Sequence, residues 1–595
     1  MAENKKLVTE LLDEWKSLAN IRRPWEAYWR EVARYVLPNT ATYDMMLGST
    51  ATAVDGVVNT PVSARRSDLY DMTSLWAIER LTAGILSLKT PESQPWQDLG
   101  TDSLFGEEMT HPEKVSLEKL RDYMFKVRSN PRTGFWPAHK SAIRSMCAFG
   151  DGFLFVEETP TRDARIPYRY TYMPISELFP GVDAAGVLDR MFRIFRWSAV
   201  QIVGKFGIDN VSANVKNAFN NANDKHNTFR LMHAVRPRPE DEKRGKIGVL
   251  AGSYQSIYIL PDEEHMLGEG GFNEFPFVRY AWSNSGTSPF CEGPVAYAIG
   301  ELRSLQEMAR NELIASQQMI RPAYATYGKN FQRLNLNPGQ VNPGLITAEG
   351  KQLFAPMNTG ARPDFAQSII EARRNSLREL LYLNLWQIIV QDKNDTATEA
   401  LIKAQEKGEL LGPVGISLNG GLSMMTDREI AILGRKGAFE DGSPLAMPDS
   451  MADRDVTPVF TSPLDRLRRM SELIGMQRLV EFATMLAGGD PQKAASIMAR
   501  LDVDEMLERA QEILGAPVSS LKSREATDEQ RDADGQMGQA MMALEAMKQG
   551  GEAATAIGTG AQALGQGADV AQGSKALPGM LASAPAAAEA GAMLQ

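Results

Sequence analysis

Residues 293–322 read GPVAYAIGELRSLQEMARNELIASQQMIRP, and this stretch predicts a long helix. Pro favours the first turn of a helix, and between Pro294 and Pro322 the sequence has no further Pro and a single Gly. At about 1.5 Å per residue the helix would be roughly 40 Å long. Its apolar residues recur at spacings of three and four, which places them on one face: Val295, Ile299, Leu302, Leu305, Ala309 and Leu313.

The sequence after this helix predicts an irregular segment, called the excursion here, and then a second helix. Residues 322–363 lose the helical period and accumulate Pro and Gly, which indicates short strands and turns. Asp364 is then expected to cap a second long helix, whose apolar face runs from Ile369 to Leu385. The predicted order is therefore helix, excursion, helix.

A third long helix is expected after a polar insert, Gln391–Asp395. Thr396 and Glu399 have the spacing of a capping box, which marks the start of a helix. Gly412-Pro413 is expected to break or kink this helix before it resumes as far as Gly437. A strand at 456–460 and further helices within 464–515 follow.

The N-terminal half predicts a helical part and then an α/β part. Helices are expected over the first 38 residues and at 69–88, 112–129 and 136–148, with a long loop or arm at 39–66. From Gly150 the pattern changes to short β-branched and aromatic runs, with helical pieces at 198–206 and 209–221. The predicted strands are 153–157, 168–173, 190–197, 229–235, 254–260 and 275–282.

Composition describes a folded protein without a disulfide framework. The 595 residues are 43% hydrophobic and 23% charged, and the net charge is −10. An acidic chain of this kind does not coat nucleic acid, so any contact with DNA is expected to be local and weak. Two cysteines, Cys147 and Cys291, exclude zinc spacings. We expect neither a signal peptide nor a membrane span, because no apolar run approaches about 20 residues.

Motifs that would carry catalysis are absent from the sequence. There is no phosphate-binding GxxxxGK[ST], no GxGxxG, no GxSxG and no HExxH. The five histidines show no spacing suited to a metal ion. We therefore predict that the chain is not an enzyme and binds no cofactor.

The order of several blocks resembles the head-to-tail connector, or portal, proteins of short-tailed, T7-like bacteriophages. Each block is weakly specific by itself, and their order in one chain carries the resemblance. The blocks are Trp25–Pro38, Leu81–Gly84 leading to Pro91 and Trp96, Gly186–Asp189 leading to Trp197, Asn273–Phe277 leading to Trp282, and Asp395–Glu399 opening the third helix.

This resemblance implies a mixed α/β, mainly helical portal fold that forms a homo-oligomeric ring, usually of twelve subunits. It also implies a division of the chain. The expected parts are an α/β wing at 1–293, a first stem helix at 294–321, a clip at 322–363, a second stem helix at 364–386, a channel loop at 387–396, a long wing helix and return strand at 397–463, a helical crown at 464–550, and a flexible Ala/Gly-rich tail at 551–595.

The implied function is structural: a ring at one capsid vertex that nucleates assembly, conducts double-stranded DNA during packaging and ejection, and attaches the tail. Expected partners are further copies of the chain, non-specific DNA, the major capsid and scaffolding proteins, the terminase large subunit, and tail adaptor and internal core proteins. The expected location is the virion, after assembly in the host cytoplasm. The alternatives are a tail or scaffolding component that binds the portal, and a packaging enzyme.

The same resemblance indicates residues that could face DNA. In the channel loop these are Asp392, Lys393, Asn394 and Asp395. Arg303, Arg310, Arg374 and Arg378 could line the stem, although their Glu neighbours equally suit salt bridges within or between subunits.

Lys393→Ala is expected to change DNA retention or packaging while ring assembly stays intact, because a lysine in a channel loop would contact phosphates without holding the subunits together. Packaged DNA length and ring symmetry are the two measurements. Loss of assembly would contradict a role confined to the channel.

Overall fold

The protein is described by a computed structural model that forms two compact units, Met1–Leu521 and Lys522–Gln595, and all named helices and strands belong to the first. The described residues are 2–38, 69–101, 109–160, 165–239, 248–283, 288–326, 339–341, 345–357, 363–383, 397–440, 442–451, 454–487, 497, 500–517, 520–522, 524, 527–528 and 530–531. The arm at 39–66, the channel loop at 387–396 and the tail at 551–595 lie outside them.

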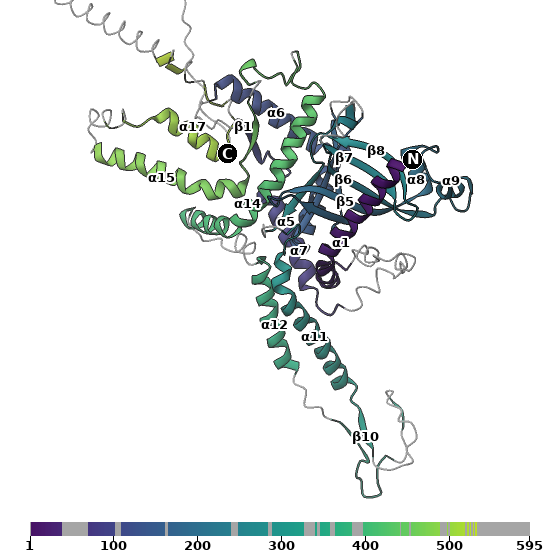
Figure 1. Cartoon of the computed structure of the whole chain (residues 1–595). Helices are drawn as coiled ribbons and strands as arrows, with labels where there is room; N and C mark the ends of the chain where they lie inside the picture. The colour runs from purple at the N-terminus through teal and green to yellow at the C-terminus, as the bar shows by residue number, and fades with distance from the viewer. Residues whose placement is uncertain are drawn as a thin grey trace, which may run out of the picture. The chain divides into compact units, whose positions relative to one another are not determined.

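A five-stranded antiparallel sheet, in the order β4-β5-β6-β7-β8, has helices on both faces (Figure 1). Alternate residues of each strand point to opposite faces, so Ile194 packs against α1 and the adjacent Phe195 packs against α8 and α9. The elements are α1 (Ala2–Val36), β4 (Leu178–Val182), β5 (Leu188–Ser198), α8 (Ala199–Phe206), α9 (Ala213–Asn220), β6 (Thr228–Pro237), β7 (Tyr254–Leu260) and β8 (His265–Phe272).

The main hydrophobic core surrounds a three-stranded sheet of order β3-β2-β9. Helix α7 packs on this sheet, and Trp29 of α1 is fully buried against Phe290, with ring centroids 4.8 Å apart. The elements here are α5 (Thr73–Lys89), α6 (His111–Ser129), α7 (Phe135–Phe149), β2 (Asp151–Glu158), β3 (Tyr168–Met173) and β9 (Phe277–Ala281).

The start of β2 holds the segment that leads into the first long helix. Asp151 is fully buried, and its carboxylate accepts from Arg279 Nε at 2.7 Å and from the Cys291 N–H at 2.8 Å. Burial raises the pKa of Asp151, and Arg279 opposes this effect. A Cβ on Gly150 would lie 2.1 Å from the Cys291 carbonyl oxygen, so the two backbones meet at a distance that only glycine permits.

Helix α14 (Ala397–Arg435) is tied to the core through a buried carboxylate. Glu429 accepts from Arg128 Nη2 at 2.8 Å, and both side chains are buried. Tyr170 also donates to Glu429. Burial raises the pKa of Glu429, and the partners Arg128 and Tyr170 oppose this effect, so they offset part of the desolvation of the charged pair.

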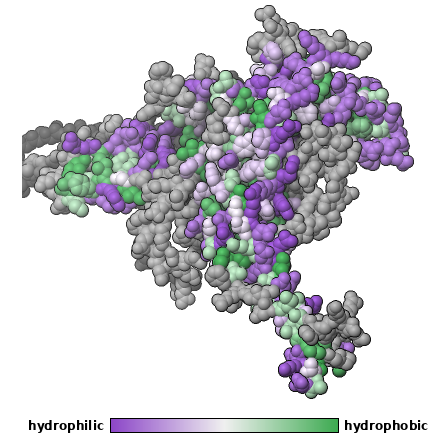
Figure 2. All heavy atoms as spheres, turned by 60° about the horizontal axis from the view of Figure 1, so that its bottom comes forward, coloured by the Kyte–Doolittle hydropathy of each residue, from purple (hydrophilic) through white to green (hydrophobic). Residues whose placement is uncertain are grey.

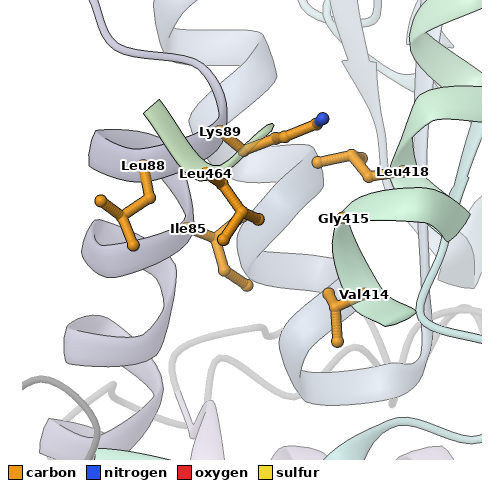
Figure 3. Close-up of a pocket in the computed structure, with 7 residues that line it drawn as sticks. All are labelled: Ile85, Leu88, Lys89, Val414, Gly415, Leu418 and Leu464. Carbon is orange, nitrogen blue, oxygen red and sulfur yellow. The ribbon is translucent and has the colours of Figure 1, made fainter. Parts of the chain in front are cut away.

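Strand β12 (Val456–Phe460) returns to pair with β1 (Gln97–Thr101) and leads into α15 (Pro463–Ala487). Helices α5, α14 and α15 meet at a small apolar hollow (Figure 3), which is lined by Ile85, Leu88, Lys89, Val414, Gly415, Leu418 and Leu464. Lys89 turns its amino group out of this hollow and binds Asp465 at 2.5 Å. Helix α17 (Val503–Leu514) packs on α15.

Helices α11 (Pro294–Ile320) and α12 (Pro363–Leu380) run side by side in opposite directions (Figure 1). The start of α11 and the end of α12 are both anchored in the main core, where Val295 of α11 and Leu381, just after α12, are buried. Between the helices, β10 (Tyr324–Thr326) pairs with β11 (Phe354–Pro356).

The mixed α/β class is confirmed, as are the predicted helix at 294–320, the strand at 456–460 and the short strands within 322–363. Several expectations about boundaries are wrong. The second long helix begins at Pro363, so Asp364 is not its cap, and it ends at Leu380 rather than 386, where Tyr382 has a φ of 61°. Helix α14 includes Pro413, so the alternative of a break at Gly412-Pro413 is wrong, whereas the alternative of a kink stays a prediction. Leu313, placed on the buried stripe of the first helix, is 49% exposed.

Gly152→Ala is expected to destabilise the protein by about 3 kcal/mol or more, because overpacking must displace backbone here. The new Cβ would lie 1.9 Å from the carbonyl oxygen of Ala142. The matched control is Gly204→Ala in α8, where a Cβ meets open space and alanine favours the helix by about 0.5–1 kcal/mol. Urea unfolding measures both; equal free energies of unfolding would contradict the close approach.

Candidate functional site

The candidate site is the pair of long helices α11 and α12, which carries the four arginines singled out in the sequence. Arg303 and Arg310 are seven residues apart and therefore share one face of α11. Arg303 donates from Nε and Nη2 to the two carboxylate oxygens of Glu31 in α1, whereas Arg310 reaches Glu307 only at 4.0 Å. Arg310 and Glu307 are more than half exposed. Of the four arginines, Arg310 has the longest ion-pair distance.

Arg374 and Arg378 lie one turn apart on α12 and share a partner. Glu371 accepts from Arg374 Nη1 at 3.1 Å and from Arg378 Nη1 at 2.9 Å. These hydrogen bonds lower the pKa of Glu371 below its usual range. Arg378 also donates to Asn375 at 2.6 Å. The preceding Arg373 points to α11 and binds Glu301 at 2.6 Å, which links the two helices.

Asp71, two residues before α5, clamps α12. Its carboxylate is nearly buried and accepts from Arg374 Nε at 2.8 Å and from the Thr73 N–H at 2.8 Å. From α11, Gln306 Oε1 accepts from the N–H groups of Tyr70 and Asp71, and its Nε2 donates to the Asp71 carbonyl at 2.7 Å. The short segment before α5 is therefore held by both long helices.

A hollow of about 350 Å³ opens beside this clamp, lined by Asp71, Met72, Thr73, Trp76, Arg374 and Arg378. Met72 is 57% exposed and Trp76 is 42% exposed, which is unusual for large apolar side chains that lie together. Arg80 lies over the Trp76 ring at 4.8 Å. The hollow combines apolar surface with planar cations, a composition that is typical of protein contact surfaces.

The sequence identified Arg374 and Arg378 but not Asp71, Gln306 or Trp76. Gln306 follows Leu305 on the apolar face of α11, and a polar residue at such a position is the signal that could have found it. The predicted channel-loop residues Asp392, Lys393, Asn394 and Asp395 lie outside the described residues. The lining roles of the four arginines stay predictions.

The charged residues of α11 and α12 described above form ion pairs within the chain. Among all the described residues, no cluster of three or more His, Cys, Asp or Glu side chains could hold a metal ion. No helix that the structure describes is both long and apolar enough to cross a bilayer. Hydrophobic residues are exposed in patches (Figure 2).

Asp71→Ala is expected to loosen α12 from the body, because it removes the carboxylate that ties Arg374 to the segment before α5 and the acceptor of the Thr73 N–H. Hydrogen bonds to charged groups contribute about 1.5–3 kcal/mol, and the partial exposure of Arg374 favours the lower end. Faster amide hydrogen exchange in α12 is the expected result. Glu307→Ala, which removes an exposed and distant ion pair, is the matched control. Equal exchange in the two variants would contradict the clamp.

Comparisons of the sequence with known proteins identify the family of this chain. The sequence model of the family described as "Bacteriophage head to tail connecting protein" matches residues 8–521, which include both long helices, both larger sheets and the clamp.

Two curated relatives match along most of their length. The portal protein of Salmonella phage epsilon15 is 26% identical over 565 residues, which cover 92% of this chain and 95% of that protein. The probable portal protein of Bordetella phage BPP-1 is 24% identical over 520 residues, which cover 85% and 87% respectively. The expected resemblance to head-to-tail connectors is confirmed, and the chain belongs to the bacteriophage head to tail connecting protein family.

Proposed function

We propose that this chain assembles into a ring at one vertex of a phage capsid, where it conducts double-stranded DNA and attaches the tail. The family match over residues 8–521 is the observation that carries the proposal. The paired helices α11 and α12 and the β10–β11 hairpin between them would be the stem and the clip. The same ring would give capsid assembly a starting point, with the capsid, scaffolding, terminase, tail adaptor and internal core proteins as its partners.

Charge supports a conduit rather than a tight DNA-binding surface. Duplex DNA carries about one negative charge per 1.7 Å, so a uniformly basic channel would hold it fast. This chain has a net charge of −10, so a ring of twelve copies would carry roughly −120. Such a field lets DNA slide, provided that a few cations give shallow contacts with the phosphates.

The four arginines differ in how closely they are paired with carboxylates of the chain, and therefore in how available they would be to DNA phosphates. Arg303 is engaged by Glu31, and Arg374 and Arg378 share Glu371, so their charges are already compensated within the chain. Arg310 keeps its exposed guanidinium 4.0 Å from Glu307. We therefore expect Arg310, together with Lys393 of the polar insert, to supply the shallow phosphate contacts. No catalytic role is proposed.

Electron microscopy of the purified chain is the first test. A closed ring near twelvefold, with an axial hole of at least the roughly 20 Å width of duplex DNA, is the expected result, together with no ATP hydrolysis. Monomers or filaments without a hole would favour a tail or scaffolding component. ATP hydrolysis by the pure chain would favour a packaging enzyme.

A further inference from the structure

Tyr297, in the first turn of α11, is 72% exposed, whereas its near neighbours Val295 and Ala298 are buried. Aromatic side chains of this size bury 150–250 Å² when they find a partner, so an exposed one at a rigid, well-anchored helix start is available for a contact. Gly300, one turn further on, has open space where a Cβ would be. Another chain could approach this face of α11 closely.

The helical period places Tyr297 on the other side of the helix pair from the hollow beside the clamp. Tyr297 precedes Gln306 by nine residues, which is two and a half turns, so the two side chains point in opposite directions from the α11 axis. Gln306 binds the segment that carries Met72 and leads to Trp76. The hollow and the tyrosine therefore lie on opposite faces.

The two features also lie at the same level along the helices. The ion pair between Glu301 and Arg373 sets the register of the antiparallel helices. Arg378 follows Arg373 by five residues, which corresponds to about 7.5 Å along the axis and brings it level with residue 296 of α11. Tyr297 of one copy and Arg378 of another can meet when the copies are related by rotation about an axis roughly parallel to the helices.

We propose that Tyr297 of each copy inserts into the hollow between Trp76, Met72 and Arg378 of the next copy, and that this contact joins neighbouring subunits of the ring. The inference rests on the proposed function, because it names the surface through which the ring closes. The tyrosine ring would pack on the apolar side chains and under the planar guanidinium of Arg378. Tyr, Trp and Arg are the residues that dominate the energetics of protein interfaces.

The contact is heterologous, because a projection on one face meets a different surface on the other. Contacts of this type produce closed rings when the rotation between copies closes, and they give every copy one donor and one acceptor surface. An isologous dimer would instead bring two identical faces together.

Cross-linking distinguishes the heterologous contact from an isologous one. Gly300→Cys preserves Tyr297, and Met72→Cys marks the hollow. The native thiols of Cys147 and Cys291 are buried, and burial raises the pKa of each to about 12, so they stay unreactive. A short bismaleimide should convert rings of the double variant into a ladder of covalent oligomers. An equimolar mixture of the two single variants should give dimers at most, and each single variant alone should give monomers.

Truncation measures the strength of the contact. Tyr297→Ala should raise the protein concentration needed for ring formation by tenfold or more, which is about 1.4 kcal/mol per contact. Ile314→Ala, at an exposed position further along α11 on another face, is the matched control and should change it less than twofold. Circular dichroism and thermal unfolding should be the same for both variants.

Rings that form normally in Tyr297→Ala, or that give no ladder in the double variant, would overturn this contact while leaving the proposed ring in place. Cross-linked dimers of Gly300→Cys alone would overturn it in favour of an isologous contact. A wild-type chain that forms no ring would instead refute the proposed function, and this inference with it.

Discussion

The buried carboxylate of Asp151 is the group on which the arrangement of the long helices depends. It stands where β2 begins, receives the Arg279 guanidinium from β9 and the Cys291 N–H from the segment before α11, and is excluded from water. An uncompensated charge at this depth would cost several kcal/mol, so the site is stable only when both donors are in place. Because Gly150 and Gly293 pack backbone against backbone beside it, the origin of α11 has little room for adjustment. The point at which α11 leaves the body is fixed there, and the Glu301–Arg373 ion pair then sets its register against α12.

A second constraint holds the helices from the other side. Arg374 and Gln306 converge on Asp71, so α5, α11 and α12 share one polar junction at the edge of the main core. Of the four arginines considered for DNA contact, Arg303, Arg374 and Arg378 form close ion pairs with carboxylates within the chain. Under the proposed function, this pairing would leave little of their charge free to hold phosphates.

Periodicity in the sequence predicts the elements but not their long-range partners. The helix at Pro294–Ile320 and the strands β3 and β7 follow directly from apolar spacing and β-branched runs. Strand β8, with three glycines, and the short β1 have little strand propensity and form because β7 and β12 offer backbone partners. The sequence predicts a later end for α12 than the structure has, because Tyr382 adopts a left-handed conformation that nothing in the neighbouring sequence indicates. For the candidate site, Arg374 was predicted, but Asp71 lies about 300 residues away in sequence, and only the folded chain brings the two together.

Strand β1 can pair with β12 only late in the synthesis of the chain. Gln97 pairs with Phe460, so an early strand waits for about 360 further residues before its partner leaves the ribosome. At bacterial and eukaryotic elongation rates of about 5–20 residues per second, that interval is roughly 20–70 seconds. The ion pairs Arg128–Glu429 and Lys89–Asp465 also join residues more than 300 positions apart, so they too close late. A chain whose translation stops early therefore lacks the closed body that positions α11 and α12, and such fragments would be poor competitors of complete chains during assembly.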